Sequence, residues 1–234
     1  MPTKKIHQES HKTKESRKDS KVKKATKAET SQIKALFLEH YKNAKTELKY
    51  RNDFELLIAV MLSAQCTDKR VNLITPALFE KYPTPQDLQD ASLEEIKECI
   101  KTCSFFNNKA KNLQAMAKEV CEKFGGEIPL DREVLKTLPG VGQKTANVVL
   151  IESQAANFIA VDTHVFRVSH RLGLSYATTP IATEEDLTRV FKDNLATLHQ
   201  AMVLFGRYVC KAVNPNCAEC FLEPLCKSKT TYRC

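Results

Sequence analysis

The strongest constraint on the fold is the spacing of apolar residues, which recur every three to four positions through most of the chain. Ile33, Leu36 and Phe37 recur in this way within an expected helix over 31–43. The segment 54–63 is apolar almost all round, which is typical of a helix buried on every side. No stretch of six or more residues alternates as a half-buried strand would. The sequence therefore predicts an all-α protein of about ten helices.

Several helix ends carry their own signals. Ser92 followed by Glu95 predicts a capping box for a short helix. An amphipathic segment from Lys109 to Phe124 stops at two glycines that suit a C-terminal cap. Asp162 or its neighbour Thr163 is expected to cap a helix that follows an apolar segment.

Composition narrows the cellular setting. The chain has 234 residues and is 42% hydrophobic, which is enough for a large buried core. Its apolar runs are too short for a membrane span, and its N-terminus lacks the apolar core of a secretion signal. We therefore expect a cytoplasmic protein. Because the cytoplasm keeps thiols reduced, nine cysteines suggest a metal or cluster site rather than a set of disulfides.

Positive charge is concentrated at the N-terminus. Residues 1–30 hold ten Lys or Arg and four Asp or Glu, a net charge of about +6 out of +8 for the whole chain. This segment is too poor in apolar residues to build a core, so it predicts a disordered basic tail. Such a tail strengthens nucleic-acid binding through phosphate contacts. A solvated extension without a specific role is equally consistent with the same composition.

The stretch LPGVGQKTA (138–146) places a turn with two glycines directly before a helix. Gly140 and Gly142 can take positive φ, and they let another backbone come close. The first N–H groups of the following helix would then converge on one point, an arrangement that binds phosphate. A simple helical hairpin packed against its neighbours is the alternative.

Four cysteines near the C-terminus have the spacing C-x6-C-x2-C-x5-C, and they are Cys210, Cys217, Cys220 and Cys226. Four thiolates within 17 residues can surround one metal centre. The spacing alone favours neither zinc nor a [4Fe–4S] cluster. The other five cysteines have no such spacing and are expected to be buried or incidental thiols: Cys66, Cys99, Cys103, Cys121 and Cys234.

From about Ser31 to Cys226 the chain resembles the bacterial endonuclease III family of helix-hairpin-helix DNA glycosylases. The motifs that carry the resemblance are LLIAVMLSAQCTD (56–68), LPGVGQKTANVVL (138–150), AVDTHVFRV (160–168), GRYVC (206–210) and the cysteine spacing. The resemblance implies a six-helix domain over 46–156. It also implies an iron–sulfur domain that combines 31–45 with 157–234, and a DNA-binding cleft between the two.

The resemblance also implies the roles of individual residues. Lys144 would be the nucleophile that attacks C1′ of the sugar and forms a Schiff base, and Asp162 would stabilise positive charge there. Gln65 would fill the gap left by a flipped nucleotide, and Phe105 matches an apolar wedge more loosely.

Further contacts follow from the same pattern. His164 would contact the DNA backbone, together with the hairpin at Gly140 and Gly142. The four cysteines would hold a [4Fe–4S] cluster that shapes a DNA-contacting loop. The loop 211–216 departs from the family because Lys211 is its single basic residue, where relatives usually carry several.

The function implied is that of a bifunctional DNA glycosylase and abasic-site (AP) lyase in base excision repair. It would remove oxidised pyrimidines from duplex DNA and cut the strand 3′ to the abasic site by β-elimination. Two alternatives stay open: a glycosylase for a mismatched or alkylated base, and a non-catalytic helix-hairpin-helix DNA-binding module. We expect a monomer, because the sequence has no heptad pattern.

Overall fold

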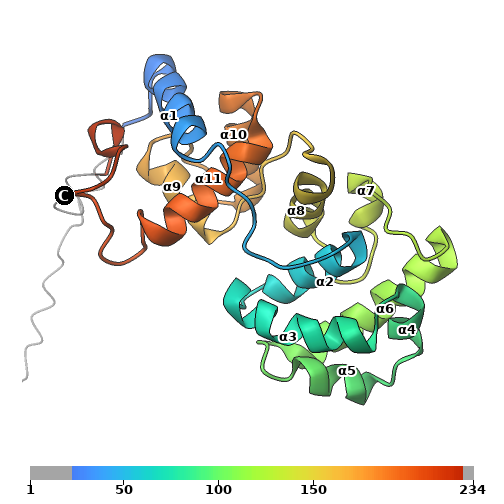
Figure 1. Ribbon diagram of the computed structural model, residues 1–234. Coiled ribbons are helices and arrows are strands. Elements are labelled where there is room, and N and C mark those ends of the chain that lie inside the picture. Colours follow the sequence, from blue (N-terminus) through green and yellow to red (C-terminus); the bar gives the residue numbers. More distant parts are fainter. Residues whose placement is uncertain (1–22, 229–234) are drawn as a thin grey trace, which may run out of the picture.

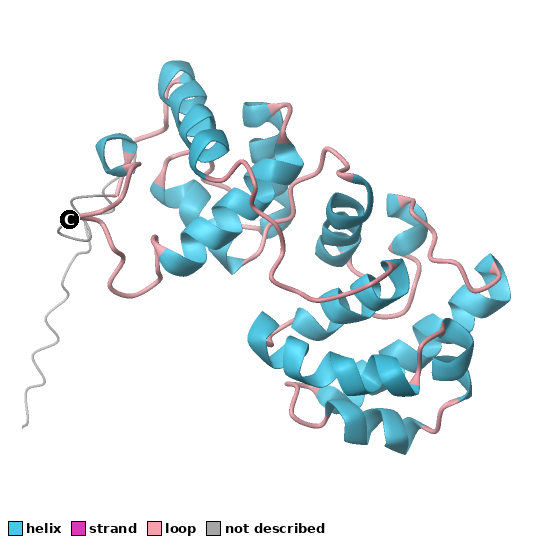
Figure 2. Ribbon diagram, viewed as in Figure 1, coloured by secondary structure: helices cyan, strands magenta, loops and turns pink. Residues whose placement is uncertain are grey.

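The computed structural model describes residues 23–228, and its fold is all-α, as predicted. Figure 2 shows helices joined by loops, and no strand occurs among these residues. The first six helices are α1 (Lys27–His40), α2 (Asp53–Ser63), α3 (Asp68–Lys81), α4 (Pro85–Asp90), α5 (Leu93–Ile100) and α6 (Phe106–Phe124). The others are α7 (Arg132–Leu135), α8 (Gln143–Gln154), α9 (Thr163–Arg171), α10 (Pro180–Phe191), α11 (Leu195–Tyr208) and the 3₁₀-helix η1 (Glu223–Leu225).

The first helix begins earlier than the sequence predicted. Thr26 caps α1 and forms a capping box with Glu29, so the helix starts at Lys27 rather than near Ser31. The backbone N–H of Ala25 donates to Gly173 O at 3.0 Å, which ties this segment to the end of α9. The prediction of a disordered tail over 1–30 is therefore wrong for residues 23–30. The composition of this segment is lysine-rich, and composition alone does not reveal the capping pair. The rest of that prediction concerns 1–22, which lie outside the described residues.

Other helix ends follow local caps. Gly125 ends α6 with φ 63°, as predicted, and Ser92 and Glu95 form the predicted capping box. Helix α6 begins at Phe106, three residues before the predicted start. The short helix α4 was not predicted, although Thr84 caps it with a third capping box. No helix in the described part of the chain is long and apolar enough to cross a membrane.

Buried apolar side chains form two clusters. The first is built on α2, where every residue from Phe54 to Leu62 is buried, and it extends through α3–α8. The second joins Ile33 and Phe37 of α1 to apolar residues of α9–α11 and the C-terminal segment. In Figure 1, α1 and α9–α11 form one group of helices and α2–α7 the other, with α8 between them. The predicted boundaries of two domains stay a prediction.

Ion pairs connect the helices of the two clusters. Arg132 of α7 contacts Glu184 of α10, with 2.5 Å between Nη2 and Oε1, and Glu184 also accepts from Gln143 Nε2 at 3.0 Å. Arg207 of α11 contacts Asp68 of α3 at 2.8 Å. The Glu184 and Asp68 side chains are mostly buried, so these contacts are shielded from water. They join α7 and α8 to α10, and they join α3 to α11.

Candidate active site

The turn before α8 uses its two glycines differently. Gly140 has φ 77°, and a Cβ added there would come within 2.8 Å of Asn112 Cβ. Positive φ and close packing both require glycine at this position. Gly142 has φ −94°, so it does not use the freedom of glycine to take positive φ. It is the N-cap of α8, and a Cβ there would meet nothing within 4 Å. Gly142 therefore leaves the N-terminus of α8 open to an incoming group.

Lys144 lies in the first turn of α8 and is exposed. The first N–H groups of α8 have no side-chain cap, since Gly142 provides none. The positive end of the helix dipole therefore lies in the turn that carries Lys144 and is open to an anionic group such as a phosphate.

Asp162 is the N-cap of α9, as predicted. Its Oδ1 accepts hydrogen bonds from the backbone N–H groups of His164 and Val165, both at 2.8 Å. Because both bonds end on Oδ1, the second carboxylate oxygen is left to face other groups. Capping thus fixes the orientation of the carboxylate without using all of its hydrogen-bonding capacity.

The segment that leads to Asp162 is held from two sides. Asn147, one turn after Lys144 on α8, donates from Nδ2 to Ile159 O at 3.4 Å. His199 of α11 contacts Ala160 O through Nδ1 at 3.0 Å. Both side chains are buried, at 0% and 3% exposure. The spacing between Lys144 and Asp162 is therefore set by buried contacts rather than by a flexible loop.

His199 is a candidate site residue that sequence reasoning missed. It lines a small pocket together with Lys144 and Asp162. The pKa of His199 is lowered to about 4, chiefly by burial. The Asp162 charge and the hydrogen bond to Ala160 oppose this shift, and the Lys144 charge adds to it. The imidazole is therefore neutral at pH 7. The sequence shows His199 only as a polar residue on the apolar face of α11. A histidine that merely packs in the core would produce the same pattern, so the pattern does not identify a site residue.

A larger cleft of about 1010 Å³ opens above this pocket. Its lining includes four residues predicted for the site: Gln65, Lys144, Asp162 and His164. Four other predicted residues are not part of this lining: Phe105, Gly140, Gly142 and Lys211. Phe105 precedes α6 with φ 59° and is 63% exposed, as a wedge into DNA would need to be. Lys211 is exposed beside Cys210.

Acidic groups in the cleft are paired with a cation. Glu47 and Asp68 line the cleft, and Arg207 contacts both carboxylates. Burial works to lower the pKa of Arg207, but the bonds to Asp68 and Glu47 outweigh it and raise the pKa. This pairing removes much of the repulsion that two carboxylates would exert on a polyanion in the cleft.

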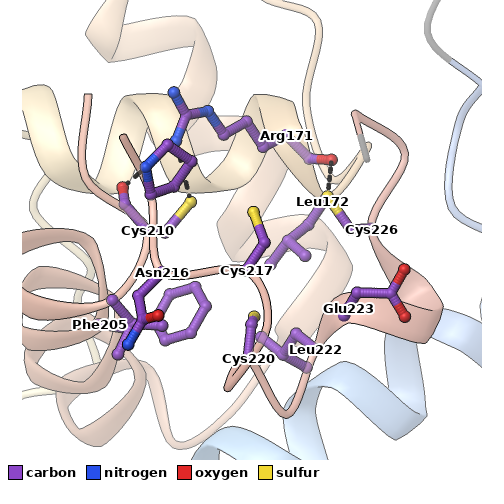
Figure 3. A pocket seen from close by; sticks show the side chains of 12 residues that line it. Arg171, Leu172, Phe205, Cys210, Asn216, Cys217, Cys220, Leu222, Glu223 and Cys226 are labelled. Carbon is purple, nitrogen blue, oxygen red and sulfur yellow. Dashed lines mark hydrogen bonds between the residues drawn. The ribbon is translucent and has the colours of Figure 1, made fainter. Parts of the chain in front are cut away.

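The four predicted metal-ligand cysteines surround a second cavity. Figure 3 shows Cys210, Cys217, Cys220 and Cys226 around it, and Leu172, Leu222 and Phe205 complete part of the wall. Among the described residues, no three His, Cys, Asp or Glu are grouped as around a single metal ion. Four cysteine side chains lining one cavity are a donor set that both a zinc ion and an iron–sulfur cluster take from proteins.

Arg171 lies against this cavity and donates to sulfur. Its Nη1 donates to Cys210 Sγ at 3.2 Å, a contact marked in Figure 3. The same nitrogen is 2.7 Å from Lys211 O. The backbone N–H of Ser228 lies 3.4 Å from Cys226 Sγ. Burial raises the pKa of the Cys220 and Cys226 thiols. N–H donors and a positive charge near sulfur are features that stabilise thiolate ligands.

Comparisons with known proteins place these features in context. Residues 58–193 match the family model described as HhH-GPD superfamily base excision DNA repair protein. Endonuclease III of Bacillus subtilis (strain 168) is 48% identical over 80% of this chain and 86% of its own length. Endonuclease III of Synechocystis sp. is 44% identical over 86% of this chain and 93% of its own length.

Solved structures agree with these relatives. A trapped endonuclease III–DNA covalent intermediate aligns with a TM-score of 0.86 and 43% identity, covering 89% of this chain and 99% of the other. A non-covalent endonuclease III–DNA complex aligns with a TM-score of 0.85. A thermostable thymine-DNA glycosylase shares the fold at 23% identity, with a TM-score of 0.77.

Proposed function

The chain belongs to the endonuclease III family of the HhH-GPD base excision repair superfamily, and from this premise we propose that Lys144 is its nucleophile. It is a bifunctional DNA glycosylase and AP lyase of base excision repair. The observation that supports the role of Lys144 is its position at the open N-terminus of α8, in one cleft with Asp162.

The proposed reaction begins with the unprotonated amine of Lys144. Its lone pair attacks C1′ of the sugar, the glycosidic bond breaks, and the base leaves with the bonding electrons and takes up a proton. The attached nitrogen then gives up one proton, the C1′–O4′ bond breaks, and O4′ takes up a proton, which leaves a protonated Schiff base between the nitrogen and C1′. The imine acidifies the 2′ hydrogen, and its loss expels the 3′ phosphate by β-elimination.

Asp162 supports this step through the part of its carboxylate that capping leaves available. Oδ1 is held by two N–H groups of α9, so Oδ2 can face the positive charge that develops on the sugar. His199 is a positioning residue, because its bond to Ala160 O fixes the backbone two residues before Asp162.

Duplex DNA with a damaged base or abasic site is the proposed substrate. Gln65 and His164 line the cleft, and exposed Phe105 lies on the neighbouring loop, so these residues would fill and flank the space left by a flipped nucleotide. Oxidised pyrimidines are the proposed lesion class. The predicted monomeric state and cytoplasmic location stay predictions, and light scattering tests the first.

The four cysteines around the second cavity would hold a [4Fe–4S] cluster. Such a group supplies a rigid centre that shapes the loop 211–216, which contributes Lys211 to DNA binding. Arg171 supports the same loop directly, because its guanidinium donates to Lys211 O at 2.7 Å and Ala212 O at 3.2 Å.

Borohydride trapping tests the proposed nucleophile. Wild-type protein, Lys144→Ala and the control Lys118→Ala are incubated with duplex DNA that carries thymine glycol or an abasic site. Lys118 is an exposed lysine on α6, away from the cleft lining. We expect a covalent adduct with wild type and Lys118→Ala and none with Lys144→Ala. An adduct that persists in Lys144→Ala would assign the nucleophile to another amine.

Lesion choice is tested by base release in the same assay. Duplexes with thymine glycol, 3-methyladenine or mismatched adenine are compared under single-turnover conditions. We expect release of thymine glycol to be fastest. Faster release of either other base would replace the proposed lesion class, and binding without release of any base would support a non-catalytic module.

A further inference from the structure

Two cysteines outside the metal-site spacing lie side by side in the loops that carry Gln65 and Phe105. Cys66 directly follows Gln65 in the α2–α3 loop, and Cys103 lies two residues before Phe105 in the α5–α6 loop. Cys103 Sγ lies 3.4 Å from Leu62 O, at the end of the helix that leads into Cys66. The Cys66 thiol is close enough to Cys103 to raise the pKa of that thiol. Both thiols are free. The sequence predicted only buried or incidental thiols here and did not indicate that these two belong to neighbouring loops.

Lys109 ties the same two loops together. Its Nζ donates to Leu62 O at 2.8 Å and to Ala64 O at 2.7 Å, which are carbonyl groups at the end of α2. The same Nζ lies 3.1 Å from Cys103 Sγ, and this sulfur also contacts Leu62 O at 3.4 Å. One partly buried network therefore joins the end of α2 to the α5–α6 loop.

The two loops are held in restricted conformations. Gln65 has φ 55° and Phe105 has φ 59°, and both lie in the left-handed region that residues with a side chain adopt at a cost. Such conformations persist only where the surrounding contacts fix them. A new covalent bond between Cys66 and Cys103 would therefore act on the backbone that orients Gln65 and Phe105.

We propose that Cys66 and Cys103 are an oxidation site, at which a hydroperoxide converts the thiol pair to a disulfide that weakens DNA binding. The effect on DNA rests on the proposed function, because it assumes that Gln65 and Phe105 enter the duplex. The disulfide itself depends only on the thiol pair and its surroundings.

The two thiols have different access to an oxidant. Cys66 is half-buried and lines the cleft, whereas Cys103 is 2% exposed. A small hydroperoxide therefore reaches Cys66 first, and bound DNA covers the same route. Burial raises the pKa of the Cys103 thiol, while the Lys109 ammonium opposes this shift and stabilises the thiolate.

The reaction balances in two steps. The Cys66 thiolate attacks one oxygen of the hydroperoxide, an S–O bond forms, the O–O bond breaks, and the alcohol or water leaves after taking a proton. The Cys103 sulfur then attacks the sulfenic sulfur, the S–S bond forms and the S–O bond breaks, and the departing hydroxide takes the proton of the Cys103 thiol and leaves as water. Two thiols and one hydroperoxide give one disulfide, one alcohol or water, and one further water.

The expected change in structure follows from bond length. A disulfide places its sulfurs about 2.05 Å apart, well inside the distance between two thiols that are not bonded. The two loops must therefore move closer, and Lys109 loses its contact with the Cys103 thiol. We expect Gln65 and Phe105 to leave the orientation that suits DNA.

The test treats the full-length protein with hydrogen peroxide, with and without duplex DNA that carries an abasic-site analogue. Peptide mapping without reducing agent should find the Cys66 and Cys103 peptides cross-linked, with the loss of two hydrogen atoms, and less of this product when DNA is bound. Cys66→Ser and Cys103→Ser should lack the product. Cys121→Ser, a matched control on α6, should keep it.

DNA binding by fluorescence anisotropy provides the second readout. Peroxide should weaken binding by wild type several-fold, dithiothreitol should restore it, and Cys66→Ser should bind equally before and after treatment. Visible absorbance, followed in parallel, separates this effect from damage to a metal cluster. Absence of the cross-link in DNA-free protein would overturn the site, and a cross-link without weaker binding would overturn its effect. Failure of the reduced protein to cleave DNA would count against the proposed function alone.

Discussion

His199 of α11 binds the backbone carbonyl of Ala160 at 3.0 Å, two residues before Asp162. Because a carbonyl oxygen only accepts hydrogen bonds, Nδ1 must carry the hydrogen and Nε2 the lone pair. The neutral form of the buried imidazole thus both fixes the Asp162 segment and lines the pocket beneath Lys144. A proton on Nε2 would add a second positive charge beside the Lys144 amine.

The low pKa of His199 predicts a pH dependence of stability. Its pKa is about 4 in the folded protein, below the ordinary value of 6.5. Between these values the unfolded chain binds the proton and the folded protein does not, so stability falls as pH decreases through this window. The loss by pH 5 should be about 2 kcal/mol.

Urea unfolding from pH 8 to pH 5 checks this value in wild type and in His199→Asn. The asparagine side chain can still donate to Ala160 O, but it has no titrating group. We expect the stability of His199→Asn to fall less steeply over this range. Parallel curves for the two proteins would assign the pH dependence to other groups.

Two substitutions of Asp162 should separate its role as a helix cap from its role in base release. Asn caps a helix nearly as well as Asp, so Asp162→Asn should cost little stability, whereas Asp162→Ala should cost about 1 kcal/mol through loss of the cap. Both variants lose the carboxylate, and the rate of base release should fall by about 10²-fold or more in each.

Thermal unfolding and single-turnover glycosylase rates measure these effects side by side. A rate in Asp162→Asn close to that of wild type would show that Asp162 acts through its cap alone. A similar loss of stability in both variants would mean that the charge, rather than the capping oxygen, stabilises the start of α9.

The sequence predicted the parts of the site that local patterns carry. The Lys144 turn and the Asp162 cap are set by residues adjacent in the chain, so both were predicted, and the structure brings them to one cleft. His199 and Asn147 reach their positions through tertiary packing of α11 and α8. Their contacts span 39 and 12 residues, and periodicity alone does not distinguish them from ordinary core polar residues.

Helix ends show the same limit. The start of α1 depends on the capping pair Thr26 and Glu29, which lies within a lysine-rich composition typical of disorder. The conformation of Gly142 depends on the packing of the hairpin, and its φ of −94° differs from the expectation for a turn glycine. Composition therefore gave the wrong result at the start of α1, and turn propensity alone does not determine the φ of Gly142, because specific local contacts decide the backbone at both places.

The two glycines of the hairpin predict opposite outcomes for the same substitution. Gly140→Ala introduces a Cβ at φ 77°, within 2.8 Å of Asn112 Cβ, so it should destabilise the protein by about 2 kcal/mol or more. Gly142→Ala adds a Cβ in open space at φ −94°, so it should change stability by less than about 1 kcal/mol.

Binding of an abasic-site duplex distinguishes the two positions further. If phosphate approaches the N-terminus of α8, the Cβ of Gly142→Ala should weaken binding in a protein of nearly normal stability. Wild-type affinity in Gly142→Ala would place the phosphate elsewhere, and unchanged stability in Gly140→Ala would contradict the close packing at Asn112.

The cysteine cavity predicts that one ligand substitution should remove iron. Cys220→Ser replaces a thiolate in the wall of the cavity, whereas Cys121→Ser changes a thiol on α6 and serves as the matched control. Since a [4Fe–4S] cluster needs all four thiolates for stable binding, Cys220→Ser should lose iron and visible absorbance, and Cys121→Ser should keep both.

Loss of the cluster should also weaken DNA binding through the loop 211–216. Arg171 would still donate to Lys211 O, so the loop should keep part of its conformation. The protein should therefore keep part of its affinity for DNA. Iron content and anisotropy measured on the same samples check both statements. Full iron content in Cys220→Ser would remove this cysteine from the ligand set. If the wild-type protein contained zinc instead of iron, the four cysteines would hold a single zinc ion rather than a [4Fe–4S] cluster.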